Sequence, residues 1–360
     1  MLRLSILLLL ALICVAEQPQ AQSRTLDIYW VDVEGGAATL FVAPSGESML
    51  IDTGWDVGDR DAARIGAAAK AAGLQRIDHV VISHYHTDHV GGLAALAKLM
   101  PLGRIYSPGD KIEPANQKWL DVVRATAGDR RTIVKPGDRV PLSGVEVQIV
   151  ASDVALIERP LRGGGPNALC ATAEEKAPAG FENQRMVGTH LRYGDFTFLA
   201  LIDLDWQKEM ELVCPVNRVG PITLYQSGRH GAFDGAGAPV LLNAIKPQVV
   251  VINNGPRKGL GQVDDSAKPT TPAGRKVTPY ERNGYARLMQ IPGIEGVWQG
   301  HLSLLDKDPA HNTTPDMIAN VEETADCKGH WIKASVQPNG QFTVTNGRNG
   351  FSRTYASRKS

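Results

Sequence analysis

Short apolar runs separated by turn residues dominate the chain from residue 25 onward. In residues 25–55, TLDIYWVDVEGGAATLFVAPSGESMLIDTGW, Gly-Gly and Pro-Ser-Gly interrupt the apolar runs, which predicts three short strands of a β-meander. Residues 61–74, DAARIGAAAKAAGL, are rich in alanine and close on Gly73, as is typical of a helix and its end. Residues 76–84, RIDHVVISH, predict a buried strand, and residues 92–100, GLAALAKLM, predict a second helix.

The alternation of strands and helices continues towards the C-terminus. It predicts strands within 145–152, 189–203, 222–228 and 248–255, and helices at 206–213 and 238–246. This order indicates a layered α/β protein with mixed sheets. Residues 330–346, HWIKASVQPNGQFTVTN, predict a β-hairpin that turns at Pro338, Asn339 and Gly340. Two segments rich in Gly, Pro and Ala, 159–184 and 259–284, predict long loops, which in compact domains are often functional rims.

The first 22 residues have the pattern of an export signal. Arg3 precedes an apolar run from Leu4 to Val15, and small and polar residues follow. A membrane-spanning helix needs roughly 20 apolar residues, so this shorter run predicts a cleaved signal peptide. Lipidation at Cys14 is the alternative, although the bulky Ile13 precedes it where a small residue is expected. We therefore expect a periplasmic or secreted protein, with one domain at 23–360 that ends in the C-terminal β-hairpin.

The charge composition does not indicate a particular class of binding partner. Lys and Arg total 38 and Asp and Glu total 38, so the formal net charge is zero, and no long basic run is present. This balance disfavours a stable complex with nucleic acid. We expect a small-molecule or other locally held substrate and no membrane span in the mature chain, while the composition leaves the oligomeric state open.

Removal of the signal leaves three cysteines, Cys170, Cys214 and Cys327, in a compartment where disulfides persist. Their spacing suits neither a zinc ribbon nor a redox pair. Cys170 lies in the long loop before Asn183, and Cys214 closes the helix predicted at 206–213. We expect these two to be bonded, with Cys327 unpaired.

Three of the nine histidines crowd into ISHYHTDHVGG, residues 82–92. His84 and His86 are two apart on a predicted strand end, so both side chains project to one face and can meet one metal ion. Asp88 and His89 sit where the chain bends into the next helix and can face a second ion. Imidazoles beside a carboxylate suit Zn²⁺ best, and also Mn²⁺ or Fe²⁺. Helix capping, the alternative, explains Asp88 but not three histidines in register.

This H-x-H-x-D-H pattern, after a buried strand and before a Gly-Gly helix start, resembles the signature of the metallo-β-lactamase fold. The resemblance covers about residues 25–305 and implies an αββα sandwich of mixed β-sheets with two divalent metal ions at the edge between the sheets. VDVEGGAATL followed by LIDTG resembles the extracellular hydrolase domain of the DNA-uptake protein ComEC and its secreted relatives.

The resemblance implies further site residues. Asp52, in LIDTG, lies beneath the metal loop in this fold and is expected to accept a hydrogen bond rather than bind metal. The segment ENQRMVGTHLRYGDFTFLALID ends at Asp203, the position of the carboxylate that bridges the two metals. Asp205 is the competing choice, but an N-cap role for the helix at 206–213 suffices to explain it. LYQSGRHGAF corresponds to a His-His-Gly element and points to His230.

Four positions depart from the family pattern. Asn183 stands where lactamase and lactonase branches carry a third histidine for the first metal, Met186 replaces a serine, and Ile202 replaces the glycine before the bridging aspartate. Arg229 replaces the first histidine of the His-His pair. The first metal is therefore expected to be held more loosely, and Arg229 is expected to offer a bidentate cation to a phosphate.

The remaining histidines and two basic residues carry weaker signals. His79 and His190 lie in predicted strands, where packing is the more common role. His301 follows a strand-like segment and is a candidate for the cleft. Asn253, Arg257 and Lys258 in NNGPRKG are candidates too, although the two basic residues fit a solvated loop at least as well.

Together these patterns predict a secreted metal-dependent hydrolase. Two ions roughly 3.5–4 Å apart would hold a hydroxide that attacks the substrate. The expected metal ligands are His84, His86, Asp88, His89, Asp203 and His230, and the expected catalytic residues are Asp88, Asp203 and Arg229. A phosphodiester is the expected substrate because its two non-bridging oxygens can each meet an ion. A β-lactamase or lactonase on the same fold and a catalytically degenerate binding protein are the alternatives.

Overall fold

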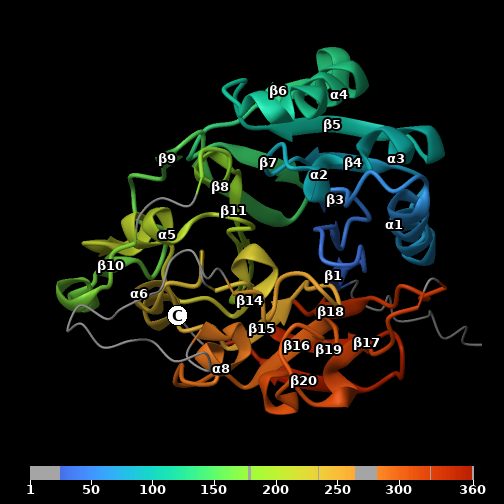
Figure 1. Cartoon of the computed structure of the whole chain (residues 1–360). Helices are drawn as coiled ribbons and strands as arrows, with labels where there is room; N and C mark the ends of the chain where they lie inside the picture. The colour runs from blue at the N-terminus through green and yellow to red at the C-terminus, as the bar shows by residue number, and fades with distance from the viewer. Residues whose placement is uncertain (1–24, 177–179, 234, 264–281, 325, 359–360) are drawn as a thin grey trace, which may run out of the picture.

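The computed structural model describes residues 25–176, 180–233, 235–263, 282–324 and 326–358. The export signal expected at residues 1–22 and much of the loop expected at 259–284 lie outside them. Two nine-stranded sheets pack face to face, with helices on their outer faces (Figure 1). No helix in the described ranges is both long and apolar enough to cross a membrane.

The first sheet has the order β20-β19-β18-β1-β2-β3-β4-β5-β6. Pairing is antiparallel from β20 to β3 and parallel from β3 to β6. The expected meander and hairpin are present, and the hairpin extends this sheet through β1. The strands are β1 (Leu26–Trp30), β2 (Thr39–Val42), β3 (Ser48–Ile51), β4 (Ile77–Val81), β5 (Leu102–Ser107), β6 (Arg131–Ile133), β18 (Ile332–Val336), β19 (Gln341–Asn346) and β20 (Ser352–Ala356).

The second sheet has the order β17-β16-β15-β14-β12-β11-β8-β7, with β9 paired to β8, and a separate small sheet joins β10 to β13. Pairing is parallel from β12 to β17. The strands are β7 (Arg139–Leu142), β8 (Val145–Ser152), β9 (Ala155–Leu156), β10 (Gly165–Pro166), β11 (Gly188–Tyr193), β12 (Phe196–Ala200), β13 (Val216–Asn217), β14 (Leu224–Gln226), β15 (Val249–Ile252), β16 (Gly296–His301) and β17 (Ile318–Asn320).

The helices cover the outer faces of the sheets. Alanine-rich α1 ends before Gly73, as its pattern predicts, and α5 begins at the residue after Asp205. The α-helices are α1 (Arg60–Ala71), α2 (Thr87–Val90), α3 (Leu93–Leu99), α4 (Gln117–Ala127), α5 (Trp206–Val213), α6 (Pro239–Ile245) and α8 (Gly284–Leu288). The 3₁₀ turns are η1 (Pro114–Asn116), η2 (Gly128–Arg130), η3 (Ala168–Thr172), η4 (Asn183–Arg185), η5 (Gly228–Gly231), η6 (Pro309–His311) and η7 (Pro315–Met317).

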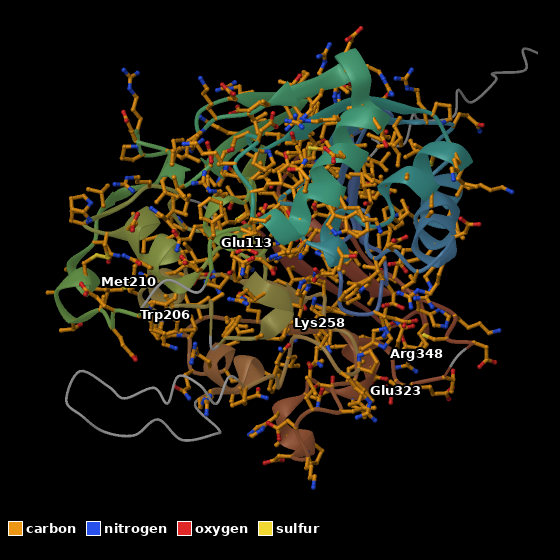
Figure 2. All side chains as sticks on the ribbon, turned by 45° about the horizontal axis from the view of Figure 1, so that its top comes forward. Glu113, Trp206, Met210, Lys258, Glu323 and Arg348 are labelled. Atoms are coloured by element: carbon orange, nitrogen blue, oxygen red, sulfur yellow. A yellow bond between two sulfur atoms is a disulfide. The ribbon has the colours of Figure 1, made fainter. Side chains whose placement is uncertain are left out.

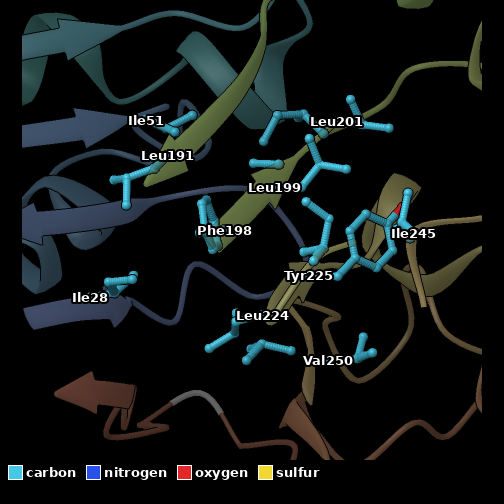
Figure 3. Close-up of a cluster of buried hydrophobic side chains, with 14 of the residues drawn as sticks. Ile28, Ile51, Leu191, Phe198, Leu199, Leu201, Leu224, Tyr225, Ile245 and Val250 are labelled. Atoms are coloured by element: carbon cyan, nitrogen blue, oxygen red, sulfur yellow. The ribbon is translucent and has the colours of Figure 1, made fainter. Parts of the chain in front are cut away.

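The core lies between the two sheets. Ile28 and Ile51 from the first sheet and Leu191 and Phe198 from the second belong to one buried apolar cluster (Figure 3). A second buried cluster fills the space between the first sheet and helices α1, α3 and α4. Because both faces of the sheets are covered, most strands have few exposed residues, as expected of central strands in layered α/β proteins.

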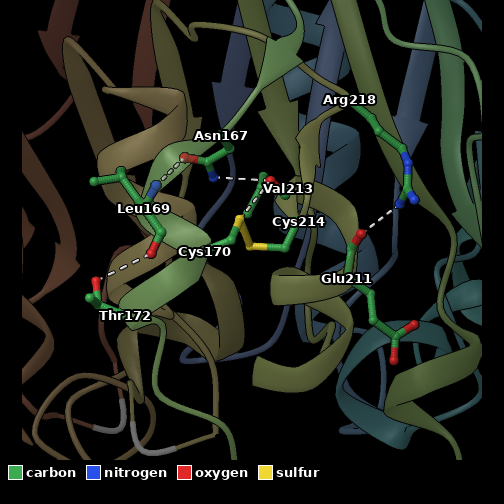
Figure 4. The surroundings of a disulfide bond; sticks show 8 residues. All are labelled: Asn167, Leu169, Cys170, Thr172, Glu211, Val213, Cys214 and Arg218. Carbon is green, nitrogen blue, oxygen red and sulfur yellow. Dashed lines mark hydrogen bonds between the residues drawn. A yellow bond between two sulfur atoms is a disulfide. The ribbon is translucent and has the colours of Figure 1, made fainter.

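The expected disulfide between Cys170 and Cys214 is confirmed, with a Cα–Cα distance of 5.7 Å, and Cys327 is free, also as expected. The bond joins η3 to the residue after α5 (Figure 4). The disulfide therefore attaches the long loop to the C-terminal end of α5, whereas Asp203 precedes the N-terminal end of this helix.

Candidate metal centre

The candidate site lies where parallel strands of both sheets end. β3 leads to Asp52, β4 to His84, β12 to Asp203, β14 to His230 and β15 to Lys258. Side chains beyond the carboxyl ends of parallel strands converge at one edge of a sheet, which is where α/β proteins usually bind ligands. Residues far apart in the sequence therefore meet at the edge of the sandwich.

The histidine loop differs in one respect from the expectation. β4 ends at Val81, so His84 and His86 lie on a loop rather than on the strand itself. The reason is that the Ser83 N–H donates to the side chain of Asp52, at 2.7 Å, instead of to a neighbouring strand. The two rings still meet, because His84 Nε2 lies 2.9 Å from His86 Nδ1.

The helix expected at residues 92–100 is preceded by a separate short helix, α2, that carries Asp88 and His89. Gly91 and Gly92 separate it from α3. A side chain at either glycine would collide with the backbone of residues 53–56, which crosses the helix start there. The Gly-Gly pair thus allows this crossing segment to lie against the histidine loop.

The structure brings all six expected metal residues together in two groups. The first group is His84, His86 and Asp203, and the second is Asp88, His89 and His230. In each group one nitrogen or oxygen atom per residue lies within 4.8 Å of the others. The structure therefore offers two adjacent sets of metal-binding atoms.

Asp203 lies between the two groups. Its Oδ2 atom is 3.7 Å from His89 Nε2, and its Oδ1 atom is 3.4 Å from His230 Nε2. Asp205 instead caps α5, because its side chain accepts a hydrogen bond from the Lys208 N–H at 2.9 Å. The structure thus separates the two aspartates that the sequence left in competition.

Three atoms at the centre of the site fit a metal ion. His89 Nε2, His230 Nε2 and Asp203 Oδ1 are buried and have no hydrogen-bond partner among the described residues. Buried polar atoms almost always have a partner, and leaving one without costs about 1–3 kcal/mol. Imidazole nitrogens and carboxylate oxygens are ligands of Zn²⁺ and related divalent ions. The residues present therefore suit a divalent metal.

Asp52 has the expected role of a hydrogen-bond acceptor. It is fully buried, and its Oδ2 atom lies 2.8 Å from His89 Nδ1. It also accepts from the Ser83 N–H and hydroxyl, each at 2.7 Å. These contacts fix the His89 ring so that Nε2 points towards Asp88 and Asp203.

The histidines and carboxylates of the cluster shift one another's pKa values. Burial tends to raise the pKa values of Asp88 and Asp203, but His89 and His230 outweigh it and hold both pKa values well below the usual range. Burial and the neighbouring His89 hold the pKa of His84 well below its usual value. At neutral pH the carboxylates are therefore ionised and His84 is neutral, the forms in which these side chains bind metals.

His230 occupies the cluster although its neighbour departs from the family pattern. Arg229 and His230 both have positive φ angles, 46° and 55°. This backbone directs His230 Nε2 to within 3.4 Å of Asp88 Oδ2, while Nδ1 lies 3.1 Å from Asn253 Nδ2. The second residue of the former His-His pair is thus the one that reaches the site.

The described contacts of the Arg229 side chain lie outside the metal cluster. Its guanidinium packs against Gly235, and among the described residues it forms no hydrogen bond or ion pair with the cluster. The cation at the cluster is Lys258, whose Nζ atom contacts the Asp88 carboxylate and lies 4.3 Å from the centre of the Trp55 ring. Arg257 pairs with Glu323 at 2.8 Å and is largely exposed, as expected of a residue in a solvated loop. Lys258 instead contacts the cluster.

Glu113 and Glu182 were not among the site residues expected from the sequence, although Glu182 begins the segment ENQRMVGTHLRYGDFTFLALID. Glu113 Oε2 lies 4.0 Å from His86 Nε2. Buried Glu182 accepts the N–H groups of Tyr85 at 3.3 Å and Glu113 at 3.0 Å. Figure 2 labels Glu113, from the loop before α4, and Lys258, from the loop after β15.

Three positions that depart from the family pattern, Asn183, Ile202 and Met186, are buried. Asn183 begins η4, and its Oδ1 atom has no partner among the described residues. Ile202 adopts a φ of 46°, which a branched side chain rarely does and which suits the glycine it replaces. Met186 is fully buried in the core.

The histidines expected to pack do so. His79 Nε2 lies 3.0 Å from Glu47 Oε1, and burial lowers the pKa of His190 in β11 to about 4. His301, expected as a candidate for the cleft, instead contacts Asp32, with 2.6 Å between Nε2 and Oδ1.

Comparisons with known proteins agree with this architecture. Residues 31–175 match the model of the metallo-beta-lactamase superfamily, a segment that contains the histidine loop but neither Asp203 nor His230. Competence protein ComA of Neisseria gonorrhoeae is 38% identical over 137 residues, which are 34% of this chain and 19% of ComA. Atrochrysone carboxyl ACP thioesterase of Emericella nidulans is 29% identical over 127 residues, 34% of this chain and 40% of that protein.

Among solved structures, the metallo-beta-lactamase fold protein YhfI from Bacillus subtilis is 13% identical, with a TM-score of 0.39, and the match covers 63% of this chain and 85% of YhfI. The chain spans less than half the length of both curated relatives. Residues 31–175 resemble the metallo-beta-lactamase superfamily, and the two-sheet sandwich with its His/Asp groups has the metallo-β-lactamase fold.

Proposed function

We propose that this protein is an exported, metal-dependent phosphodiesterase. The observation that carries the proposal is the Asp203 carboxylate, which lies between the His84/His86 pair and the Asp88/His89/His230 group. A carboxylate shared by two sets of imidazoles is suited to a site for two ions, and such sites are common in enzymes that cleave phosphate esters.

In this proposal His84, His86 and Asp203 would hold one ion, and Asp88, His89 and His230 would hold the second. Zn²⁺ suits these ligands best, and Mn²⁺ and Fe²⁺ bind the same atom types. Bound ions would supply Lewis acidity and activate water for attack at neutral pH.

The chain's own residues orient the metal-binding histidines and keep the carboxylates ionised. Asp52 orients His89, and Asn253 orients His230 through the 3.1 Å contact to Nδ1. Because the pKa values of Asp88 and Asp203 are lowered, both carboxylates are ionised at neutral pH, which is the form that binds a metal ion.

Lys258 supports an anionic substrate. Its ammonium lies at the Asp88 edge of the cluster, and its side chain is 32% exposed, so it can meet both the site and a ligand from solvent. A phosphodiester carries one negative charge on its two non-bridging oxygens, which suits a cation beside two ions. In this proposal Lys258 takes the phosphate-binding role that the sequence indicated for Arg229.

The proposal includes a place in the superfamily and in the cell. The match to ComA supports a ComEC-like branch, and the VDVEGG and IDTG segments agree with it. The N-terminal pattern of residues 1–22 and the Cys170–Cys214 disulfide support export to an oxidising compartment.

Thioester hydrolysis is a second candidate, because one matched relative is named a thioesterase. The β-lactam and lactone alternatives are less favoured, since Asn183 stands where those branches carry a third histidine. A degenerate binding protein would hold metal weakly and turn over none of these substrates.

The deciding experiment measures activity after metal removal and reconstitution with Zn²⁺ or Mn²⁺. We expect cleavage of an aryl phosphodiester that disappears in His86→Ala, and slower or no cleavage of β-lactam, lactone and thioester substrates. Efficient hydrolysis of one of the latter with the phosphodiester untouched would move the protein to that chemistry. Failure to regain any metal would overturn the enzyme proposal itself.

A further inference from the structure

A second group of metal-binding side chains lies outside the candidate centre. Asp32 follows β1, His301 ends β16, and Cys327 lies in the segment between β17 and β18. One ligand atom from each lies within 4.8 Å of the other two. Asp32 and His301 are buried and Cys327 is partly buried, so the group is shielded from most of the solvent.

The surrounding contacts orient Asp32 and leave it directed at His301. Arg64 Nη1 donates to Asp32 Oδ2 at 2.9 Å, and the Glu34 N–H donates to Oδ1 at 2.9 Å. His301 Nε2 lies 2.6 Å from the same Oδ1 atom. A carboxylate held by an arginine and a backbone N–H is how proteins commonly orient a metal ligand.

The third residue supplies the donor that the His/Asp centre lacks. The contacts of the Cys327 thiol are weak, a 3.8 Å contact with Asn320 Oδ1 and an interaction with the Gly329 N–H. Arg64 Nη2 donates to the Cys327 carbonyl at 2.8 Å and so holds this segment next to Asp32. A thiolate, an imidazole and a carboxylate together favour Zn²⁺, which binds such atoms at about 2.0–2.3 Å.

A small cavity borders the group. It is lined by Asp32, Gly300 and His330, among others, and therefore reaches the residue before His301. Zinc sites with three protein ligands keep a fourth position for water or another ligand. The cavity contacts Asp32 and therefore leaves open space beside one of the three ligands.

We propose that Asp32, His301 and Cys327 form an additional zinc site, separate from the His/Asp centre. The ion would replace the proton shared by Asp32 Oδ1 and His301 Nε2, and these atoms would need to separate by roughly 0.5–1 Å to reach normal zinc distances. The site would cross-link the first sheet to the second at the ends of β1 and β16.

The position of the site gives it a structural role. The chain runs from Asp32 through Gly36 to Ala37, whose N–H donates to the Asp88 carbonyl at 3.0 Å. The Gly36 carbonyl accepts from Asn253, which also contacts His230. An ion at Asp32 would therefore stabilise the backbone that borders the His/Asp centre.

Cobalt substitution tests the proposal on the full-length protein, because a thiolate bound to Co²⁺ gives a charge-transfer band in the near ultraviolet that imidazole and carboxylate ligands do not. We expect this band in the Co²⁺-loaded protein, its loss in Cys327→Ser, and its retention when the two disulfide cysteines are replaced together, Cys170→Ser with Cys214→Ser. Cys327→Ser should also bind one equivalent of Zn²⁺ less while the His/Asp centre keeps its metal.

Alkylation of the unmodified protein gives an independent measurement should Cys327→Ser fold poorly. Added Zn²⁺ is expected to slow reaction of iodoacetamide with Cys327 at least tenfold. Absence of the cobalt band together with an alkylation rate insensitive to Zn²⁺ would overturn the proposal and leave Asp32 and His301 as a hydrogen-bonded pair. Since neither readout uses turnover, this result is independent of whether the protein is a phosphodiesterase.

Discussion

The Nδ1 atom of His89 lies 2.8 Å from the Oδ2 atom of Asp52, and both side chains are fully buried. Asp52 follows β3 and His89 lies in α2, so the contact joins the end of a central strand to the metal loop. It fixes the ring and determines which nitrogen faces Asp88 and Asp203. The first prediction concerns this contact.

Asp52→Asn is expected to weaken metal binding. The amide lacks the charge that holds His89 Nδ1–H, and loss of such a partner typically lowers metal affinity by about 10–100-fold. Competition with a chelator, followed by metal analysis, measures this effect. Glu47→Gln is the matched control, because Glu47 contacts His79 rather than a histidine of the centre. Equal affinities for all three proteins would show that Asp52 does not position His89.

Lys258→Ala is expected to raise KM for an anionic substrate about tenfold or more, the effect of losing one hydrogen bond to a charged group. Metal content should stay the same or rise, because the ammonium no longer competes for Asp88. Arg257→Ala is the control, since the neighbouring Arg257 pairs with Glu323.

Arg229→Ala separates the two candidate cations. Its guanidinium packs against Gly235, so we expect a smaller change in KM than for Lys258→Ala. Steady-state kinetics of the three variants decide the matter. A larger effect at Arg229 would return the phosphate-binding role to that residue.

Glu209 is expected to make stability depend on pH. Burial raises its pKa to about 8, and its Oε1 atom has no hydrogen-bond partner among the described residues. The folded state therefore holds a proton that the unfolded state releases near its ordinary pKa of 4.5. The stabilisation is fully present below pH 4.5 and is lost as pH rises to about 8, at roughly 1 kcal/mol per pH unit.

Glu209→Gln should remove this dependence, so that its Tm exceeds that of the unchanged protein increasingly between pH 5 and pH 8. Glu211→Gln serves as the control, because Glu211 lies on the same helix but is 42% exposed and pairs with Lys208. Parallel Tm curves for the unchanged protein and Glu209→Gln would contradict a protonated Glu209.

Removal of the disulfide by Cys170→Ala with Cys214→Ala is expected to lower the free energy of unfolding by about 2–4 kcal/mol, because the bond closes a long loop. The two cysteines are 44 residues apart. Denaturant unfolding with and without a reductant measures the loss. Metal content should change little, since none of the six residues of the centre contacts the bond. Cys327→Ser should leave the sensitivity to reductant unchanged.

The sequence by itself determined the local elements and the nature of the site. Apolar periodicity and glycine positions predicted the first three strands, α1, α5, α6 and the C-terminal hairpin, because these signals act over a few residues. The H-x-H-x-D-H segment predicted a metal site for the same reason, since its histidines and aspartate are neighbours in the chain. Even there, the predicted strand was too long. It was expected to reach His84, but β4 ends at Val81, because the Ser83 N–H donates to the side chain of Asp52, 31 residues away.

Only the tertiary structure decided which distant residues meet. Asp203 lies in the centre and Asp205 at a helix cap, as the family resemblance implied, but only the structure brought Lys258 to Asp88 while Arg229 packed against Gly235. It also joined Asp32 to His301, which are 269 residues apart. Such contacts depend on how strands from two sheets end at one edge and on which backbone angles each loop adopts. A pattern of neighbouring residues carries no information about either.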